Sequence, residues 1–247
     1  MLRQLGTDFG FVPIVIGAST TLYALTLLLT LSMTGRIDPV GGGGFSFLPP
    51  SPVALQLFGM SGAVPVFVQG QWWTLLSATW LHGSVLHILF NMLWVRDLAP
   101  ALIDIVGVSR TVIIYTLAGV VGFLLSSVMP LVPFPIPIFH GAPYTMGASA
   151  AIFGLLGALV HYGRVSGSRY VHAQALNYAI VLFVMALFLP GVDNTAHAGG
   201  FIGGYTTSAF FNPLTRERGD HMIAAVACLF ATLLAILFSV IHGLRIV

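Results

Sequence analysis

The sequence predicts an all-α fold: a polytopic bundle of membrane-spanning helices. Of the 247 residues, 57% are hydrophobic and only 6% are charged, against about 25% charged residues in soluble globular chains. The mean hydropathy is +0.97. Apolar segments recur along the whole length, so we predict one membrane domain over residues 1–247 and no separate soluble domain.

Bulk composition also excludes some function classes. The net charge of +2 is too small to indicate nucleic-acid binding. The single cysteine, Cys228, lies in an apolar run and cannot form an internal disulfide. We expect the chain to be embedded in a lipid bilayer. The sequence does not indicate an oligomeric state.

Seven segments are candidates for helices that cross the bilayer, which needs about 20 mostly apolar residues. They are residues 11–33, 83–103, 110–130, 147–163, 173–190, 195–212 and 221–243. The first is longer than the apolar core of a signal peptide, about 7–15 residues, so we expect an uncleaved span. A long connection, 34–82, carries Gly41-Gly42-Gly43-Gly44 and Pro49-Pro50. Its aromatic part, 71–81, is predicted to lie at the membrane interface, where Trp is enriched.

The arginines predict the orientation, since the chain has no lysine. With the N-terminus inside, the inner side holds Arg3, Arg96, Arg110, Arg164, Arg169, Arg216 and Arg218, and the outer side holds Arg36 and Arg245. Positive charge favours the cytoplasmic side. We therefore expect a multi-pass protein of the cell (inner) membrane, with a cytoplasmic N-terminus and an external C-terminus.

This orientation brings three polar stretches to one side and a similar depth. Ser149 and His197 begin the fourth and sixth segments, both from the outside, and His87 lies about one turn into the second. Small residues recur every four positions on the sixth segment at Ala196, Gly200 and Gly204, and the fourth has Ala150, Gly154 and Gly157.

A helix face made of small residues lets two membrane helices approach closely. If these two faces pack together, Ser149 and His197 come within reach. A histidine can remove the proton of a serine hydroxyl during nucleophilic attack. The alternative is a helix-start histidine that contacts lipid headgroups.

Three further side chains belong to this cluster. Phe153 lies one turn below Ser149 and can stack on His197, or be an ordinary core aromatic. His87 and Asn91 share a helix face. They offer donors to a developing oxyanion, or equally hydrogen bonds between helices. His82 lies about 140° away around the helix and is predicted to be a structural residue at the rim.

No carboxylate accompanies Ser149 and His197 at a plausible depth. Asp193 lies before the helix start and is predicted to be a cap or turn residue, so a Ser–His dyad is favoured over a triad. His82, His87 and His197 lack the ligand spacing of a metal site, and we predict no metal. The remaining histidines, at 140, 161, 172, 221 and 242, are predicted to be interfacial.

Three motifs together resemble the rhomboid intramembrane serine proteases. They are Trp80-Leu81-His82-Gly83-Ser84-Val85-Leu86-His87-Ile88-Leu89-Phe90-Asn91-Met92, then Gly147-Ala148-Ser149-Ala150, then Ala196-His197-Ala198-Gly199-Gly200 with Gly204. They follow the family order, and the resemblance covers roughly residues 70–212.

The resemblance implies specific roles. Ser149 would be the nucleophile and His197 its general base, with an oxyanion hole from His87, Asn91, the Ser149 backbone N–H and the Ala148 N–H. The substrates would be transmembrane proteins, cleaved near their outer boundary without metal or cofactor. The layout would be a six-helix core, about 11–212, plus a seventh C-terminal helix, about 221–243. Residues 131–146 would shape the external mouth, and the fifth segment would be a substrate gate.

The chain departs from the family pattern at three positions. Ala150 replaces a common glycine, Trp73-Thr74 replaces a frequent Trp-Arg, and Phe153 replaces a frequent tyrosine. Two other function classes compete with the protease. A non-catalytic rhomboid-like protein that binds membrane-protein clients would be expected to lose Ser149 or His197. A small transporter would carry polar residues at both membrane faces.

Overall fold

The computed structural model describes residues 10–38 and 46–245, and its regular structure there is helical. The long helices are α1 (Phe11–Thr34), α4 (Val85–Val106), α5 (Val108–Val128), α6 (Ser149–Ser166), α7 (Arg169–Leu187), α8 (Asn194–Ala209) and α9 (Gly219–Gly243). They agree with the seven predicted segments to within a few residues. The glycine run 41–44 and Arg3 lie outside the described residues.

Short helices fill the connections. Between α1 and α4 lie α2 (Pro52–Leu57), the π-helix η1 (Val64–Val68), α3 (Thr74–Ser77) and the 3₁₀ turn η2 (Ala78–Trp80); between α5 and α6 lie the 3₁₀ turns η3 (Met129–Leu131) and η4 (Pro137–Phe139). Serines cap two of the long helices: the side chains of Ser84 and Ser168 accept hydrogen bonds from the backbone N–H groups of His87 and Val171.

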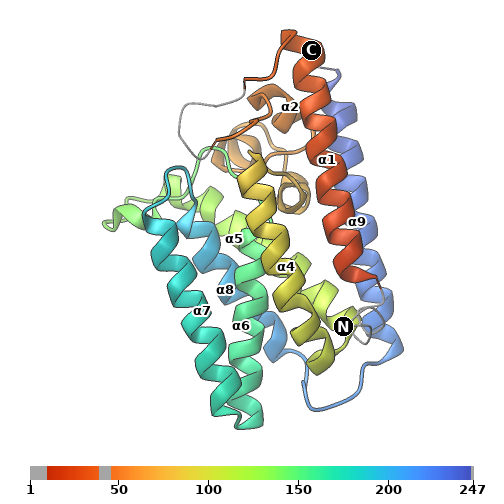
Figure 1. The fold of residues 1–247 in the computed structure, drawn as a ribbon, viewed down its shortest axis with the longest axis vertical. Coiled ribbons are helices and arrows are strands. Elements are labelled where there is room, and N and C mark those ends of the chain that lie inside the picture. The colour runs from red at the N-terminus through yellow and green to blue at the C-terminus, as the bar shows by residue number, and fades with distance from the viewer. Residues whose placement is uncertain (1–9, 39–45, 246–247) are drawn as a thin grey trace.

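The long helices lie side by side and alternate in direction, so α1 begins at one end of the molecule and α9 finishes at the other (Figure 1). In Figure 1, α6 and α8 lie beside α5, with α7 outside them and α1 and α9 on the opposite flank. Most of α6 is buried, whereas α7 buries only Ala175, Ala179 and Ala186. The helix that carries Ser149 is therefore central, and α7 is peripheral.

Among the described residues, four helical segments are individually long and apolar enough to cross a membrane: Phe11–Thr34, Val108–Leu131 (α5 continued by η3), Arg169–Leu187 and Gly219–Gly243. The other three predicted spans are less apolar or shorter. α4 carries Arg96, Asp97 and Asp104, and the 16 residues of α8 extend only about 24 Å at 1.5 Å per residue. Because α6 and α8 pack inside the bundle, neighbouring helices cover surface that lipid would otherwise meet.

The aromatic segment 71–81 belongs to the protein interior more than to the predicted interface. Trp72 is exposed, but Trp80 is buried. The indole of Trp73 donates to Ser239 Oγ at 2.9 Å, and its ring meets the Phe238 ring edge-on with centroids 4.5 Å apart. The connection before α4 is thus anchored on α9.

A buried arginine organises the connection between α8 and α9. The Arg110 guanidinium is 1% exposed and donates to the backbone carbonyls of Asn212, Thr215 and Arg216. The Glu217 carboxylate accepts the Arg110 backbone N–H at 2.8 Å. These bonds tie the start of α5 to the segment that leads into α9.

Candidate active site

Ser149 is the first residue of α6 and follows a constrained turn. Gly147 has φ +124°, a conformation that side chains strongly disfavour. Its N–H donates to the Ala78 carbonyl at 2.9 Å. Ala148 is the residue before the helix and is fully buried. The turn therefore leaves Ser149 half-buried at the helix start, two residues later than the predicted beginning of the segment.

His197 lies in the first turn of α8, and its ring meets Ser149. Nε2 of His197 and Oγ of Ser149 are 2.9 Å apart. The Phe153 ring stacks on the imidazole, with centroids 4.4 Å apart and an interplanar angle of 16°. The predicted contacts of His197 with Ser149 and Phe153 are both present.

Asp193 caps α8, as predicted. Its Oδ1 accepts the Ala196 N–H at 3.0 Å, and its Oδ2 accepts the Ser126 hydroxyl. The Nδ1 atom of His197 is buried and has no hydrogen-bond partner within the described part of the chain. The pair therefore receives no carboxylate contact from the residues that the structure describes.

The glycines of α8 face two different helices. A Cβ on Gly200 would collide with the Ala150 backbone, and a Cβ on Gly204 with the Gly154 backbone, both on α6. A Cβ on Gly199 would lie 2.9 Å from the Gly122 Cα on α5, and Gly203 also faces α5. The sequence pattern predicted one small face, at Ala196, Gly200 and Gly204. The structure has two, because successive residues project about 100° apart around a helix.

Ala150, which replaces the family's common glycine, does not separate the Ser–His pair. Its side chain points to α5, where a Cβ on Gly122 would lie only 2.8 Å from the Ala150 Cβ. Ala150 is fully buried. The extra methyl group therefore occupies space opened by Gly122 on α5, not by the glycines of α8.

His87 and Asn91 lie beside the turn that precedes Ser149. A Cβ on Gly147 would lie 2.6 Å from His87 Nε2 and 3.8 Å from Asn91 Nδ2. Asn91 Nδ2 donates to the His87 carbonyl at 2.9 Å, and His87 Nδ1 accepts the Gly83 N–H at 3.3 Å. Accepting at Nδ1 places the proton of a neutral His87 ring on Nε2, the atom that faces Gly147.

Two other histidines are more buried than predicted. His82 is 1% exposed, not at a rim, and its ring lies edge-on to His87 with centroids 5.1 Å apart. His161 is buried, not interfacial, and its Nδ1 lies 3.0 Å from Ser208 Oγ on α8. Within the described residues, no three His, Cys, Asp or Glu side chains gather as metal ligands would.

The fold and site define a class: an integral, multi-pass helical membrane protein with a serine and a histidine in contact between two central helices. Residues 69–214 match the family model of the Rhomboid domain. The chain belongs to the rhomboid family.

Several curated proteins are similar to this chain. It is 30% identical over 182 residues to Rhomboid protease GluP of Bacillus subtilis, which covers 72% of this chain and 34% of that protein. It is 29% identical over 232 residues to RHOMBOID-like protein 1 of Arabidopsis thaliana, and that match covers 84% of this chain and 57% of that protein. It is 27% identical over 169 residues to Rhomboid-like protease 3 of Toxoplasma gondii, and that match covers 66% of this chain and 60% of that protein. The matched regions thus span between about a third and three fifths of these relatives.

Proposed function

We propose that this protein is an intramembrane serine endopeptidase that hydrolyses peptide bonds of transmembrane proteins with a Ser149–His197 dyad. The observation that carries the proposal is the 2.9 Å contact between Ser149 Oγ and His197 Nε2, in a chain of the rhomboid family. Two of the similar proteins are named as proteases.

Acylation would begin with attack of Ser149 Oγ on the carbonyl carbon of the scissile peptide bond. His197 Nε2 takes the serine proton as the C–O bond forms. It then gives that proton to the leaving nitrogen when the C–N bond breaks. The Phe153 ring holds the imidazole in the plane that this transfer requires. A water molecule, deprotonated by His197, hydrolyses the ester and restores Ser149.

The oxyanion would be stabilised by two sets of donors near Gly147: side chains of α4 and backbone N–H groups at the start of α6. His87 Nε2 and the Asn91 amide face this turn, and the backbone N–H groups of Ala148 and Ser149 lie at the start of α6, before its internal hydrogen bonds begin. Asn91 Nδ2 uses one hydrogen on the His87 carbonyl, which leaves its second for a ligand. Donors aimed at developing charge lower the barrier.

Substrate would enter past α7, a long helix that buries only Ala175, Ala179 and Ala186. The segment between α5 and α6 is exposed and apolar, with Val132, Phe134 and Ile136 all at least 43% exposed. Phe139 of this segment contacts Phe183 of α7, with ring centroids 5.9 Å apart. A transmembrane substrate would displace α7 and this exposed segment together.

A serine-directed fluorophosphonate, applied to protein purified in detergent, tests the dyad. We expect labelling of the wild type, and none of Ser149→Ala or His197→Ala. Ser208→Ala is a matched control, because Ser208 also contacts a histidine between α6 and α8; it should still label. Failure of folded wild type both to label and to cleave model transmembrane substrates would sink the proposal and favour a non-catalytic client-binding protein.

Asn91→Ala tests the oxyanion role. We expect turnover of a model transmembrane substrate to fall on the order of 10²-fold, with little change in KM, because this donor acts on charge that develops in the transition state. Steady-state kinetics in detergent micelles would measure both constants. Unchanged turnover would return Asn91 to a purely structural role.

We also propose that the site opens on the external side of the cell membrane, with the N-terminus of the chain in the cytoplasm. The support is the arginine distribution, since positive charge favours the cytoplasmic side. Most of the arginines lie in or beside the segments that join α4 to α5, α6 to α7 and α8 to α9. Those segments lie at the end of the bundle where α6 finishes, whereas Ser149 begins α6 (Figure 1). A reporter that is active only outside the cytoplasm, fused to the C-terminus, should be active; an inactive reporter on folded protein would contradict this orientation.

A further inference from the structure

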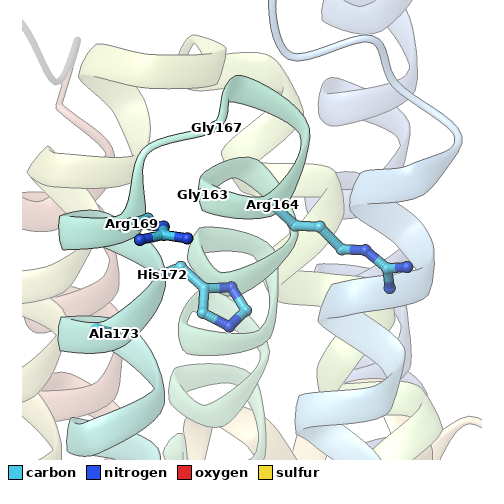
Figure 2. Close-up of a pocket in the computed structure, with 6 residues that line it drawn as sticks. All are labelled: Gly163, Arg164, Gly167, Arg169, His172 and Ala173. Atoms are coloured by element: carbon cyan, nitrogen blue, oxygen red, sulfur yellow. The ribbon is translucent and has the colours of Figure 1, made fainter.

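A basic pocket lies at the turn between α6 and α7, at the opposite end of α6 from Ser149. Its volume is about 430 Å³, and its lining residues are Gly163, Arg164, Gly167, Arg169, His172 and Ala173 (Figure 2). At 1.5 Å per residue, the 15 positions from Ser149 to Arg164 separate it from the candidate active site by about 22 Å. The pocket is thus a separate feature.

Close packing of the two helices forms the wall of this pocket. A Cβ on Gly163 would lie 2.5 Å from the His172 backbone nitrogen, so the glycine lets α7 approach α6. His172 Nδ1 lies 3.3 Å from the Val160 carbonyl. Because a carbonyl only accepts, Nδ1 is the donor of this bond, and Nε2 is the ring nitrogen available to a ligand.

The charge of the pocket is positive and has no acidic counterpart nearby in the sequence. Between Asp104 and Asp193 the chain has no Asp or Glu. In the described structure, Arg96 and Arg218 pair with carboxylates, whereas Arg164 and Arg169, which line the pocket, form no ion pair. Figure 2 shows Arg169 beside His172, while Arg164 extends away, where its guanidinium donates to Tyr205 Oη at 3.1 Å.

An apolar stripe leads out of the pocket along α7. Ala173 lines the pocket, and Leu176, Ile180 and Val184 follow at helical spacing on the same side. These three side chains are between 38% and 53% exposed. The 11 positions from Ala173 to Val184 extend about 16 Å, a length suited to the acyl chain of a lipid. Arg169 also begins a helix that qualifies as a membrane span, so the pocket lies at a membrane boundary.

We propose that this pocket binds the phosphate group of an anionic phospholipid, with the acyl chain along the exposed face of α7. Arg169 supplies the charge for the phosphate, and His172 supplies a second polar contact. Basic pockets between helices on the cytoplasmic side of a membrane are suited to such headgroups. The inference does not depend on proteolytic activity.

Thermal unfolding of the purified protein tests this site, because a ligand that binds the folded state raises the unfolding temperature. Micelles doped with phosphatidylglycerol should raise the midpoint of the wild type, and micelles doped with phosphatidylcholine should not. Arg169→Gln should raise the lipid fraction needed for half of the effect about fivefold. Arg216→Gln removes a charge at the same end of the molecule but outside the pocket, and should respond as the wild type does.

Ala173→Phe provides a second variant, since it places an aromatic ring in the pocket without changing the charge and should also weaken the response. Circular dichroism would show that each variant is folded. Three results would overturn the proposal. Both pocket variants could show the same midpoint shift with phosphatidylglycerol as the wild type, or Arg216→Gln could lose the shift as fully as Arg169→Gln does. Phosphatidylcholine could also raise the midpoint as much as phosphatidylglycerol does. A midpoint shift with inorganic phosphate and none with phosphatidylglycerol would likewise overturn it, and would make the pocket a site for free phosphate.

Discussion

At the scale of single residues, we propose that the orientation of His197 depends on the aromatic ring stacked on it. The Phe153 ring covers one face of the imidazole, and Nδ1, on the far side of the ring from Ser149, has no partner among the described groups. An aspartate often orients a histidine of this kind. In this chain, the stacked Phe153 ring would take the place of that aspartate in orienting His197.

Replacement of Phe153 tests this arrangement. Phe153→Leu keeps an apolar side chain but loses the stacked contact, which is worth about 0.5–1.5 kcal/mol. We expect the rate of fluorophosphonate labelling of Ser149 to fall up to about tenfold, with the unfolding midpoint lowered by only a few degrees. Phe153→Tyr keeps the ring and should label as the wild type does. If the leucine variant labels at the wild-type rate, Phe153 is a core aromatic and nothing more.

The spacing of the motifs predicted the contact between Ser149 and His197, but not the surroundings of the other buried histidines. The contact of Ser149 with His197 follows from small residues on two helices and is present in the structure. The burial of His82 could not be predicted from a helix face, because His82 lies between η2 and α4, outside any helix. The partner of His161 also escaped prediction, since a buried histidine and a buried serine on different helices leave no periodic signal.

At the scale of elements, the sequence predicted where the long helices form, but only in part which of them pack against one another. Apolar runs mark where a helix forms, but a run does not state whether lipid or protein covers it. The deep burial of α6 and the exposure of α7 depend on packing that periodicity does not encode. Likewise, the short glycine-rich α8 showed that close neighbours exist, but not that α5 is one of them.

Gly200→Ala tests the close approach of α8 to α6. The new Cβ would fall on the Ala150 backbone, which cannot rotate away, so the helices must separate. We expect a loss of about 1–3 kcal/mol in unfolding free energy and a marked fall in Ser149 labelling.

Gly17→Ala in α1 is the matched control, since nothing lies within 4 Å of a Cβ there. It should be neutral or stabilising by about 1 kcal/mol, as expected for alanine inside a helix. Unchanged labelling in Gly200→Ala would mean that the distance between these helices does not govern the reaction of Ser149.

At the scale of the whole molecule, α9 acts as a support for the segment before α4. The sequence has threonine after Trp73 where the family often has arginine, which left the anchoring of this connection open. The structure identifies α9 as the anchor through Ser239 and Phe238. The connection in turn holds Ala78, whose carbonyl accepts the Gly147 N–H.

Trp73→Ala should therefore weaken the bundle without removing chemistry. We expect a loss of about 3 kcal/mol in unfolding free energy, near the low end for tryptophan truncation because Trp73 is only half-buried. Ser239→Ala, which removes one hydrogen bond, should cost about 1 kcal/mol. Trp72→Ala, at a 51% exposed neighbour, should cost less than Trp73→Ala. Labelling at low temperature should survive in all three, and its loss in a folded variant would contradict a purely supporting role.

The packing of Ala150 against Gly122 has an evolutionary consequence. The methyl group of Ala150 fits because position 122 has none: a Cβ on Gly122 would lie 2.8 Å from the Ala150 Cβ. The same Cβ would also lie 2.7 Å from the Ala196 carbonyl oxygen of α8, so glycine at position 150 would relieve only part of the crowding. We expect position 122 to stay glycine whichever small residue occupies position 150, and the double exchange Ala150→Gly with Gly122→Ala to recover only part of the stability that Gly122→Ala loses.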